Sequence, residues 1–220
     1  MDIRLILVQA FVILFAITIH EAAHAWTANK MGDPTAAALG RASLNPLVHI
    51  DPIGTIILPA ILIYFSVQTG GRSPVFGWAK PVPYNPHNLR QPRKGGLWIS
   101  FAGPLANILA AICSAVLYQG LKLDQIRIVD PSQVNQPIVS LAIILQAIVA
   151  INVTLAFFNL IPIPPLDGSG VLAGLLSARA AEKFERIRPY SFFILILLIT
   201  TRALDLIFIP ARMLINLLLS

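Results

Sequence analysis

The chain has 220 residues, of which 56% are hydrophobic and only 12% are charged. So few charged side chains cannot cover a soluble domain of this length, and several apolar stretches reach the roughly 20 residues that cross a bilayer. The formal net charge of +6 does not indicate nucleic-acid binding, because the basic residues lie in the gaps between the apolar stretches. We therefore predict a polytopic membrane protein in contact with the lipid bilayer, with no nucleic-acid partner.

Four apolar stretches predict membrane-spanning helices. They are Leu5–Thr27, Leu97–Tyr118, Ile138–Ile161 and a stretch from near Tyr190 to about Ile209. The first stretch is too long for a signal peptide, although Ala23-His24-Ala25 resembles a cleavage site. A fifth stretch, Ile53–Val67, is short and is interrupted by Pro59.

These elements predict an all-α membrane protein, a bundle of about four to six transmembrane helices with Ile53–Val67 as a re-entrant segment. Between Gln68 and Gly96 the chain is polar and rich in Gly and Pro. Such a composition predicts a loop, with a short membrane-associated β-strand at Val75–Pro83. The sequence shows no repeat, so residues 1–220 are expected to form a single domain, with a catalytic core at about 5–176 and C-terminal helices at about 190–218.

The first predicted span contains the sequence His20-Glu21-Ala22-Ala23-His24. On a helix, residues four apart share a face with side chains about 5–6 Å apart, so both histidines can bind one Zn²⁺. Glu21 lies about 100° further round the helix, beside the metal, where it can take a proton from a metal-bound water. The alternative is a set of polar core residues without a metal, but ionisable residues within a membrane helix are costly and tend to mark function.

A catalytic zinc usually has three protein ligands, and most acidic residues of this chain lie in polar regions. Asp33 lies in a turn sequence, and Asp205 lies three residues from Arg202, with which it can pair. Asp167 differs because it follows three prolines that break a helix at membrane depth. Broken backbone at that depth is tolerated where it lines a cavity or is buried in protein. We therefore predict Asp167 as the third ligand of one Zn²⁺ per chain.

Three motifs carry a resemblance to a known family. HEAAH at 20–24, AGPLAN at 102–107 and NLIPIPPLDG at 159–168 follow the order of the site-2 protease family of intramembrane zinc metalloproteases (peptidase M50), and the chain resembles its small form without a PDZ domain. FGWAKPVP at 76–83 is also similar to small members. The resemblance covers roughly residues 5–176. It implies that His20, His24 and Asp167 bind zinc, that Glu21 is the catalytic base, and that Asn159 contacts the substrate or the developing oxyanion.

The shared metal constrains the membrane topology. The ends of the first span and of Ile138–Ile161 must lie on the same side of the membrane, and Leu97–Tyr118 plus Ile138–Ile161 supply the two crossings that this requires. A full crossing by Ile53–Val67 would separate the ligands. The resulting topology puts eleven Lys and Arg residues on one side and four on the other, which predicts a multi-pass protein of the cell membrane with its active site toward the cytoplasmic face.

The predicted activity is cleavage of transmembrane segments of membrane proteins by zinc-activated water, with Glu21 as general base and Asn159 as oxyanion donor. A substrate helix must unwind, and an added strand can then pair with its backbone. Pro81 and Pro83 lack N–H groups on one strand edge, so the opposite edge keeps all its donors. The residues expected to bind substrate are Phe76, Gly77, Trp78, Lys80, Val82 and Asn159.

Two other functions compete with proteolysis. A zinc-binding membrane transporter or sensor is one alternative, since transporters also place ligands at broken helices. Glu21 discriminates against it, because a pure binding site needs no base beside two ligands. An inactive homologue that acts as a binding module is the other, and the filled catalytic positions argue against it. Asn107, within the second span, is interpreted as a contact between helices in preference to a support for the site.

Overall fold

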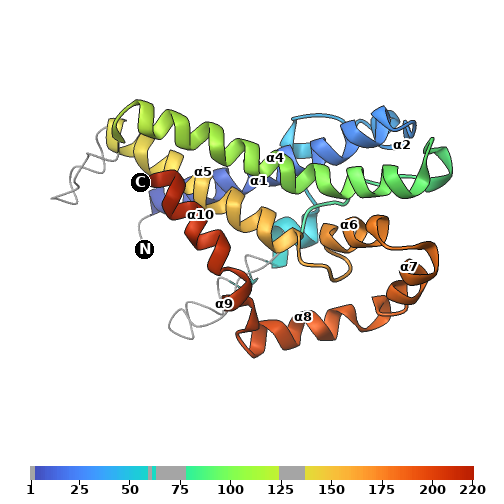
Figure 1. Cartoon of the computed structure of the whole chain (residues 1–220). Coiled ribbons are helices and arrows are strands. Elements are labelled where there is room, and N and C mark those ends of the chain that lie inside the picture. The colour runs from blue at the N-terminus through green and yellow to red at the C-terminus, as the bar shows by residue number, and fades with distance from the viewer. Residues whose placement is uncertain (1–2, 59–60, 63–77, 124–136) are drawn as a thin grey trace.

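The structure is a computed structural model that describes residues 3–58, 61–62, 78–123 and 137–220. Within these ranges the chain is helical and contains no strand (Figure 1), which confirms an all-α membrane protein. The helices are α1 (Ile3–Lys30), α2 (Thr35–Ala38), α4 (Pro92–Gly120), α5 (Pro137–Asn159), α6 (Asp167–Leu175), α7 (Ala178–Glu185), α8 (Ser191–Thr200), α9 (Ala203–Ile207) and α10 (Ile209–Leu219). Short helical turns are η1 (Pro46–Val48), η2 (Pro52–Ile57), η3 (Pro86–Asn88) and η6 (Arg188–Tyr190).

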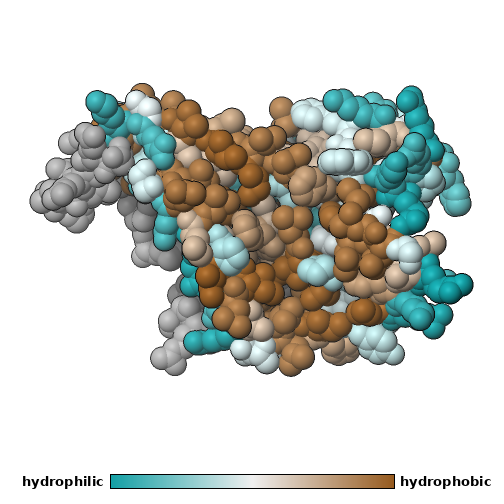
Figure 2. All heavy atoms as spheres, viewed as in Figure 1, coloured by the Kyte–Doolittle hydropathy of each residue, from teal (hydrophilic) through white to brown (hydrophobic). Residues whose placement is uncertain are grey.

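Three helices among the described residues are long and apolar enough to cross a membrane. They are Leu7–Lys30 within α1, Pro92–Gly120 and Pro137–Asn159, and they correspond to the first three predicted spans. Large apolar side chains remain exposed on their surfaces, such as Phe11 at 60% and Val116 at 65%. Figure 2 shows apolar residues over the middle of the molecule and hydrophilic residues toward its ends, as a bilayer environment requires.

The predicted fourth span, from Tyr190 to about Ile209, is not one helix. Helix α8 ends at Thr200, Arg202 adopts a left-handed conformation with φ 57°, and the chain continues through α9 into α10. The hydroxyls of Thr200 and Thr201 donate to carbonyls one turn earlier, at 2.9 and 2.6 Å, and such bonds compete with regular helix. The predicted pair of Arg202 with Asp205 is also wrong, because no ion pair joins these two described residues.

Helix α4 packs against α1, α5 and α6. Small residues let these backbones approach closely, as is usual between membrane helices. Ala111 and Ala115 of α4 meet Val149 and Val153 of α5 in one buried cluster, and Ala211 of α10 joins it. This packing fixes α4 and α5 relative to each other and to α10.

The segment between α1 and α4 leaves and rejoins the bundle at the same end. The Arg90 N–H donates to the Met31 carbonyl at 3.1 Å, just beyond the last residue of α1 and just before α4. Gly32 with φ +110° turns the chain out of α1, as glycine does after many helices. Any crossings between α1 and α4 therefore come in pairs, as the shared metal requires. Much of Ile53–Val67, the expected re-entrant segment, lies outside the described residues.

The break before Asp167 is present. Helix α5 ends at Asn159, the following residues form turns, and α6 begins at Asp167. A Cβ at Gly168 would lie 2.2 Å from the Leu160 carbonyl oxygen, so only glycine permits the first turn of α6 to pack on the turn that ends α5. This approach folds Asp167 back toward the bundle.

Candidate metal centre

The three predicted ligands come together from two distant parts of the chain. His20 and His24 lie one turn apart on α1, and Asp167 is the first residue of α6. Asp167 Oδ2 lies 2.9 Å from His20 Nε2 and 3.3 Å from His24 Nε2. One potential ligand atom from each of the three residues lies within 4.8 Å of the other two, so a single ion can reach all three.

The geometry of this cluster fits zinc. Tetrahedral ligands at roughly 2.0–2.1 Å from a zinc ion lie about 3.3 Å from one another, close to the observed separations of Asp167 Oδ2 from the imidazole nitrogens. Both histidines are buried. Asp167 Oδ2 is buried as well and has no hydrogen-bond partner. A buried carboxylate oxygen without a hydrogen bond is costly, and a cation at this point satisfies it.

Each histidine is held by the ring nitrogen that faces away from Asp167. His20 Nδ1 lies 2.5 Å from Asn107 Oδ1, and His24 Nδ1 lies 2.6 Å from the Ile99 carbonyl oxygen. The carbonyl of Ile99 can only accept, and so can Oδ1 of Asn107, so both Nδ1 atoms carry the proton and donate it. The two Nε2 atoms are then left unprotonated toward the metal position. Partners of this kind fix the ring orientation and raise the basicity of a metal-binding histidine.

Asn107 does more than join helices, which corrects the interpretation preferred from the sequence. Its Nδ2 donates to the Ala16 carbonyl at 3.0 Å and to Asn152 Oδ1 at 2.8 Å, while its Oδ1 holds His20. Asn152 in turn donates to the Ile148 carbonyl at 2.9 Å. Asn107 and Asn152 are fully buried and link α1, α4 and α5 beside His20. A sequence signal for this role exists, because Asn107 lies four residues after Gly103 and so shares its helix face.

Gly103 forms the wall of the cluster on α4. A Cβ at this position would lie 2.5 Å from His24 Nε2 and 2.6 Å from His20 Nε2. No side chain fits there without displacing the imidazole rings. The absence of a side chain at Gly103 therefore makes room for the two imidazole rings.

Two further residues, Glu21 and Asn159, are predicted to be catalytic without binding the metal. Glu21 is partly buried next to His20, and its carboxylate makes no hydrogen bond or ion pair within the part of the chain that the structure describes. Asn159 is the last residue of α5, and its Nδ2 donates to the Leu155 carbonyl at 3.1 Å. Among the described residues, no hydrogen bond connects Asn159 to His20, His24 or Asp167.

The predicted substrate strand is not observed. Phe76 and Gly77 lie outside the described residues, and Trp78 to Pro83 have no regular secondary structure. The amide of Trp78 donates to the Gly54 carbonyl at 3.1 Å, and that of Lys80 donates to the His49 carbonyl at 2.9 Å. Two amides of the edge that was expected to be free are therefore bonded within the chain, because Trp78 and Lys80 lie beside the segment around η2. The predicted edge also carries Val82 and Tyr84, and neither of their amides makes a hydrogen bond in the described chain.

Comparison with known proteins identifies the family of this chain. The sequence model of peptidase family M50 matches residues 8–201. The chain is 31% identical over 192 residues to YwhC of Bacillus subtilis (strain 168), which is named as a zinc metalloprotease, covering 86% of this chain and 78% of the relative. It is 29% identical over 195 residues to Rip2 of Mycolicibacterium smegmatis, also named as a zinc metalloprotease, covering 87% and 66%. No solved structure matches the chain. The chain belongs to peptidase family M50.

Proposed function

We propose that this intramembrane zinc metalloprotease binds its metal through His20, His24 and Asp167 and uses Glu21 as its general base. The observation that carries the proposal is the convergence of three buried ligand atoms around an Asp167 oxygen that has no hydrogen bond. Zinc, when bound, supplies a Lewis acid that lowers the pKa of water from 15.7 to about 7. The family and the ligand set give no support to a transporter or sensor.

Other residues of the chain transfer the proton, orient the imidazoles and bind the oxyanion. Glu21, which has no ion-pair partner among the described residues, accepts a proton at its carboxylate and returns it to the leaving nitrogen. Asn107 and the Ile99 carbonyl hold the two imidazoles so that neither ring turns away. Asn159 uses one of its two Nδ2 protons on Leu155. The second is available for the oxyanion that develops at the scissile carbonyl.

Family M50 acts on membrane proteins in the lipid bilayer. We propose that the substrate is a transmembrane helix that unwinds at the metal centre, and that it contacts Asn159 and the segment with Phe76, Gly77 and Val82. Of the predicted strand edge, Val82 retains a free amide for the backbone of the unwound substrate. Trp78 and Lys80 contribute only their side chains, because their amides are already bonded.

We further propose that the metal centre faces the cytoplasmic side of the cell membrane. His20 lies ten residues before Lys30, the last residue of α1, so it lies roughly 15 Å below that end of the helix at about 1.5 Å per residue. Lys30 and Arg90 lie together at this end, on the side that carries most of the basic residues. The positive-inside rule assigns such a side to the cytoplasm.

The experiment compares wild type with Glu21→Gln and Asp167→Ala, each purified and supplied with zinc. Zinc content is measured by mass spectrometry. The rate of hydrolysis is measured with a membrane-protein substrate. Glu21→Gln should keep one zinc per chain and lose about a hundredfold or more of the hydrolysis rate. Asp167→Ala should lose both zinc and hydrolysis. Hydrolysis at the wild-type rate by Glu21→Gln would refute the base, and full zinc retention by Asp167→Ala would refute the third ligand.

A further inference from the structure

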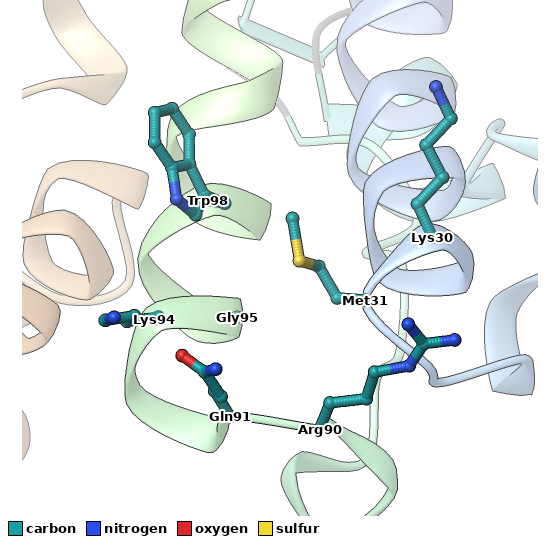
Figure 3. Close-up of a pocket in the computed structure, with 7 residues that line it drawn as sticks. All are labelled: Lys30, Met31, Arg90, Gln91, Lys94, Gly95 and Trp98. Atoms are coloured by element: carbon teal, nitrogen blue, oxygen red, sulfur yellow. The ribbon is translucent and has the colours of Figure 1, made fainter.

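A pocket separate from the metal centre lies where α1 ends and α4 begins. Its volume is about 240 Å³. In Figure 3 the Met31 side chain lies between the two helices, Arg90 and Lys30 lie on the α1 side, and Gln91, Lys94 and Trp98 belong to the start of α4. The lining residues are Lys30, Met31, Arg90, Gln91, Lys94, Gly95 and Trp98.

Three of these residues are cations without an anionic partner. The side chains of Lys30, Arg90 and Lys94 make no hydrogen bond and no ion pair within the described ranges, and no acidic residue lines the pocket. Two nearby basic side chains differ, because they have partners. Arg93 donates to the Leu176 carbonyl, and Arg188 pairs with Glu185. In Figure 3 the ends of the Lys30 and Lys94 side chains point away from the space around Met31, so these two cations lie at the rim of the pocket. Three positive charges around a pocket that no acidic residue lines attract an anion.

The position of the pocket limits the kind of anion. Lys30 ends one spanning helix, and Pro92 begins another. Trp98 lies six residues into α4, roughly 9 Å along its axis, and is 50% exposed. Tryptophan on a membrane helix is enriched at the level of the lipid headgroups. The cations therefore lie at the membrane surface, with Trp98 and Met31 providing apolar contact beside them.

We propose that this pocket binds the phosphate headgroup of an acidic membrane lipid. The guanidinium of Arg90 can bind two phosphate oxygens at once. The flexible side chains of Lys30 and Lys94 can turn toward the same phosphate and add positive charge. An acyl chain can then leave along the exposed Trp98 ring. Basic pockets between membrane helices on the cytoplasmic side suit such headgroups. The metal ligands do not line this pocket, so the proposal is independent of the proteolytic mechanism.

The test uses the full chain in nanodiscs of phosphatidylcholine with increasing fractions of phosphatidylglycerol, followed by native mass spectrometry of the lipids that stay bound. The pocket variant is Lys30→Gln/Arg90→Gln/Lys94→Gln. The control variant, Arg179→Gln/Lys183→Gln/Arg186→Gln, removes the same charge from α7 and the residue that follows it. Wild type and control should retain phosphatidylglycerol in preference to phosphatidylcholine, and the pocket variant should lose about tenfold or more in apparent affinity.

Equal losses in the two variants would overturn the proposal, because they would show general attraction of a basic surface to acidic lipid. Retention of phosphatidylcholine and phosphatidylglycerol to the same extent by wild type would overturn it as well. A second arm titrates inorganic phosphate into detergent-solubilised protein with phosphatidylglycerol bound. Weak competition is expected, because free phosphate makes no contact with Trp98 or Met31. Competition as strong as that of added phosphatidylglycerol would show a soluble phosphate site and refute the lipid.

Discussion

At the scale of single residues, the metal centre depends on partners that are not ligands. His20 is oriented by Asn107 and His24 by the Ile99 carbonyl, both on α4. Asn107 is itself held through its Nδ2 by Ala16 and Asn152. Its oxygen must then point at His20, since the amide nitrogen is already committed as a donor to two acceptors. The hydrogen-bond chain from α5 to α1 thus selects one His20 tautomer.

Replacing Asn107 by Ala should weaken zinc binding about 10- to 100-fold, because His20 loses the acceptor for its Nδ1 proton. Asn152→Ala should cost less, because Oδ1 of Asn107 stays in place and only one of its two anchors is lost. Zinc affinity is measured by competition with a chelator on protein of unchanged helix content. Unchanged affinity in Asn107→Ala would mean that Asn107 only joins the helices.

Gly103→Ala should disrupt the metal centre, since the added methyl group would lie 2.5 Å from His24 Nε2 and 2.6 Å from His20 Nε2. Gly96→Ala on the same helix is the matched control, because its Cβ would meet only the Tyr84 hydroxyl, at 3.8 Å. We expect loss of zinc and activity in the first variant and retention of both in the second. Equal zinc content in the two variants would contradict the role of Gly103.

At the scale of elements, one buried carboxylate organises the chain between α1 and α4. Asp33 accepts hydrogen bonds from Thr35 Oγ1 at 2.5 Å, the Asn85 amide at 2.6 Å and Asn88 Nδ2 at 2.8 Å. Burial works to raise the pKa of Asp33, but these hydrogen bonds outweigh it and lower the pKa from 3.8 to about 2. The turn after α1 and the loop before α4 are joined at this side chain.

Because its pKa is lower in the folded state, Asp33 stabilises the protein above about pH 4, and this contribution disappears as the pH falls from about 4 toward 2. Its size is on the order of 2 kcal/mol. Asp33→Asn should therefore lower the melting temperature in detergent at pH 7, and the difference from wild type should shrink between pH 4 and pH 2. A difference that stayed constant over this range would show that the charge of Asp33 is not involved.

The segment before α4 offers a second test at this scale. Val82→Pro removes the free amide that we propose for substrate binding and keeps a small apolar side chain, whereas Val82→Ala keeps the amide. Proteolysis should fall about tenfold or more in the first variant and change little in the second, with zinc content unaffected in both. Similar rates in the two variants would show that packing by the side chain, and not the amide, matters here.

At the scale of the whole molecule, the helix ends gather at two opposite ends of the bundle. The start of α1 and the end of α10 lie at one end of the bundle in Figure 1, and the end of α1 and the start of α4 lie at the other. Trp26 near the end of α1 donates to the Ala42 carbonyl at 3.0 Å, so the chain around α2 stays at that end. The broken path from α8 to α10 brings the C-terminus back to the end where α1 begins.

This arrangement predicts the labelling of single cysteines in a Cys113→Ser background. Cysteines at positions 41 and 90 should react with a membrane-impermeant thiol reagent from the cytoplasmic side, and a cysteine at position 122 should react from the other side. Accessibility is measured in intact cells and in inverted vesicles. Labelling of positions 41 and 90 from opposite sides would mean that the intervening segment crosses the membrane once.

The sequence alone determined what depends on local spacing and composition. An interval of four residues puts His20 and His24 on one face of any helix. The prolines after Asn159 end α5 whatever its neighbours are. The length of a membrane span follows from the thickness of the bilayer. The histidine pair and the end of α5 each depend on residues within about one or two helical turns. These local features were sufficient to predict the clustering of His20, His24 and Asp167, the first three spans and the break before Asp167.

Which distant groups meet depends on how the helices and loops pack in three dimensions. The pairing of His20 with Asn107 joins residues 87 positions apart, and the bonds of the Trp78 and Lys80 amides to Gly54 and His49 depend on how one loop lies on another. The last apolar stretch is broken at Arg202, directly after two threonine hydroxyls that bond backbone carbonyls of the preceding turn. Such contacts follow from the packing of whole elements, since a buried donor takes whichever acceptor the fold brings within about 3 Å, and no local periodicity specifies that acceptor.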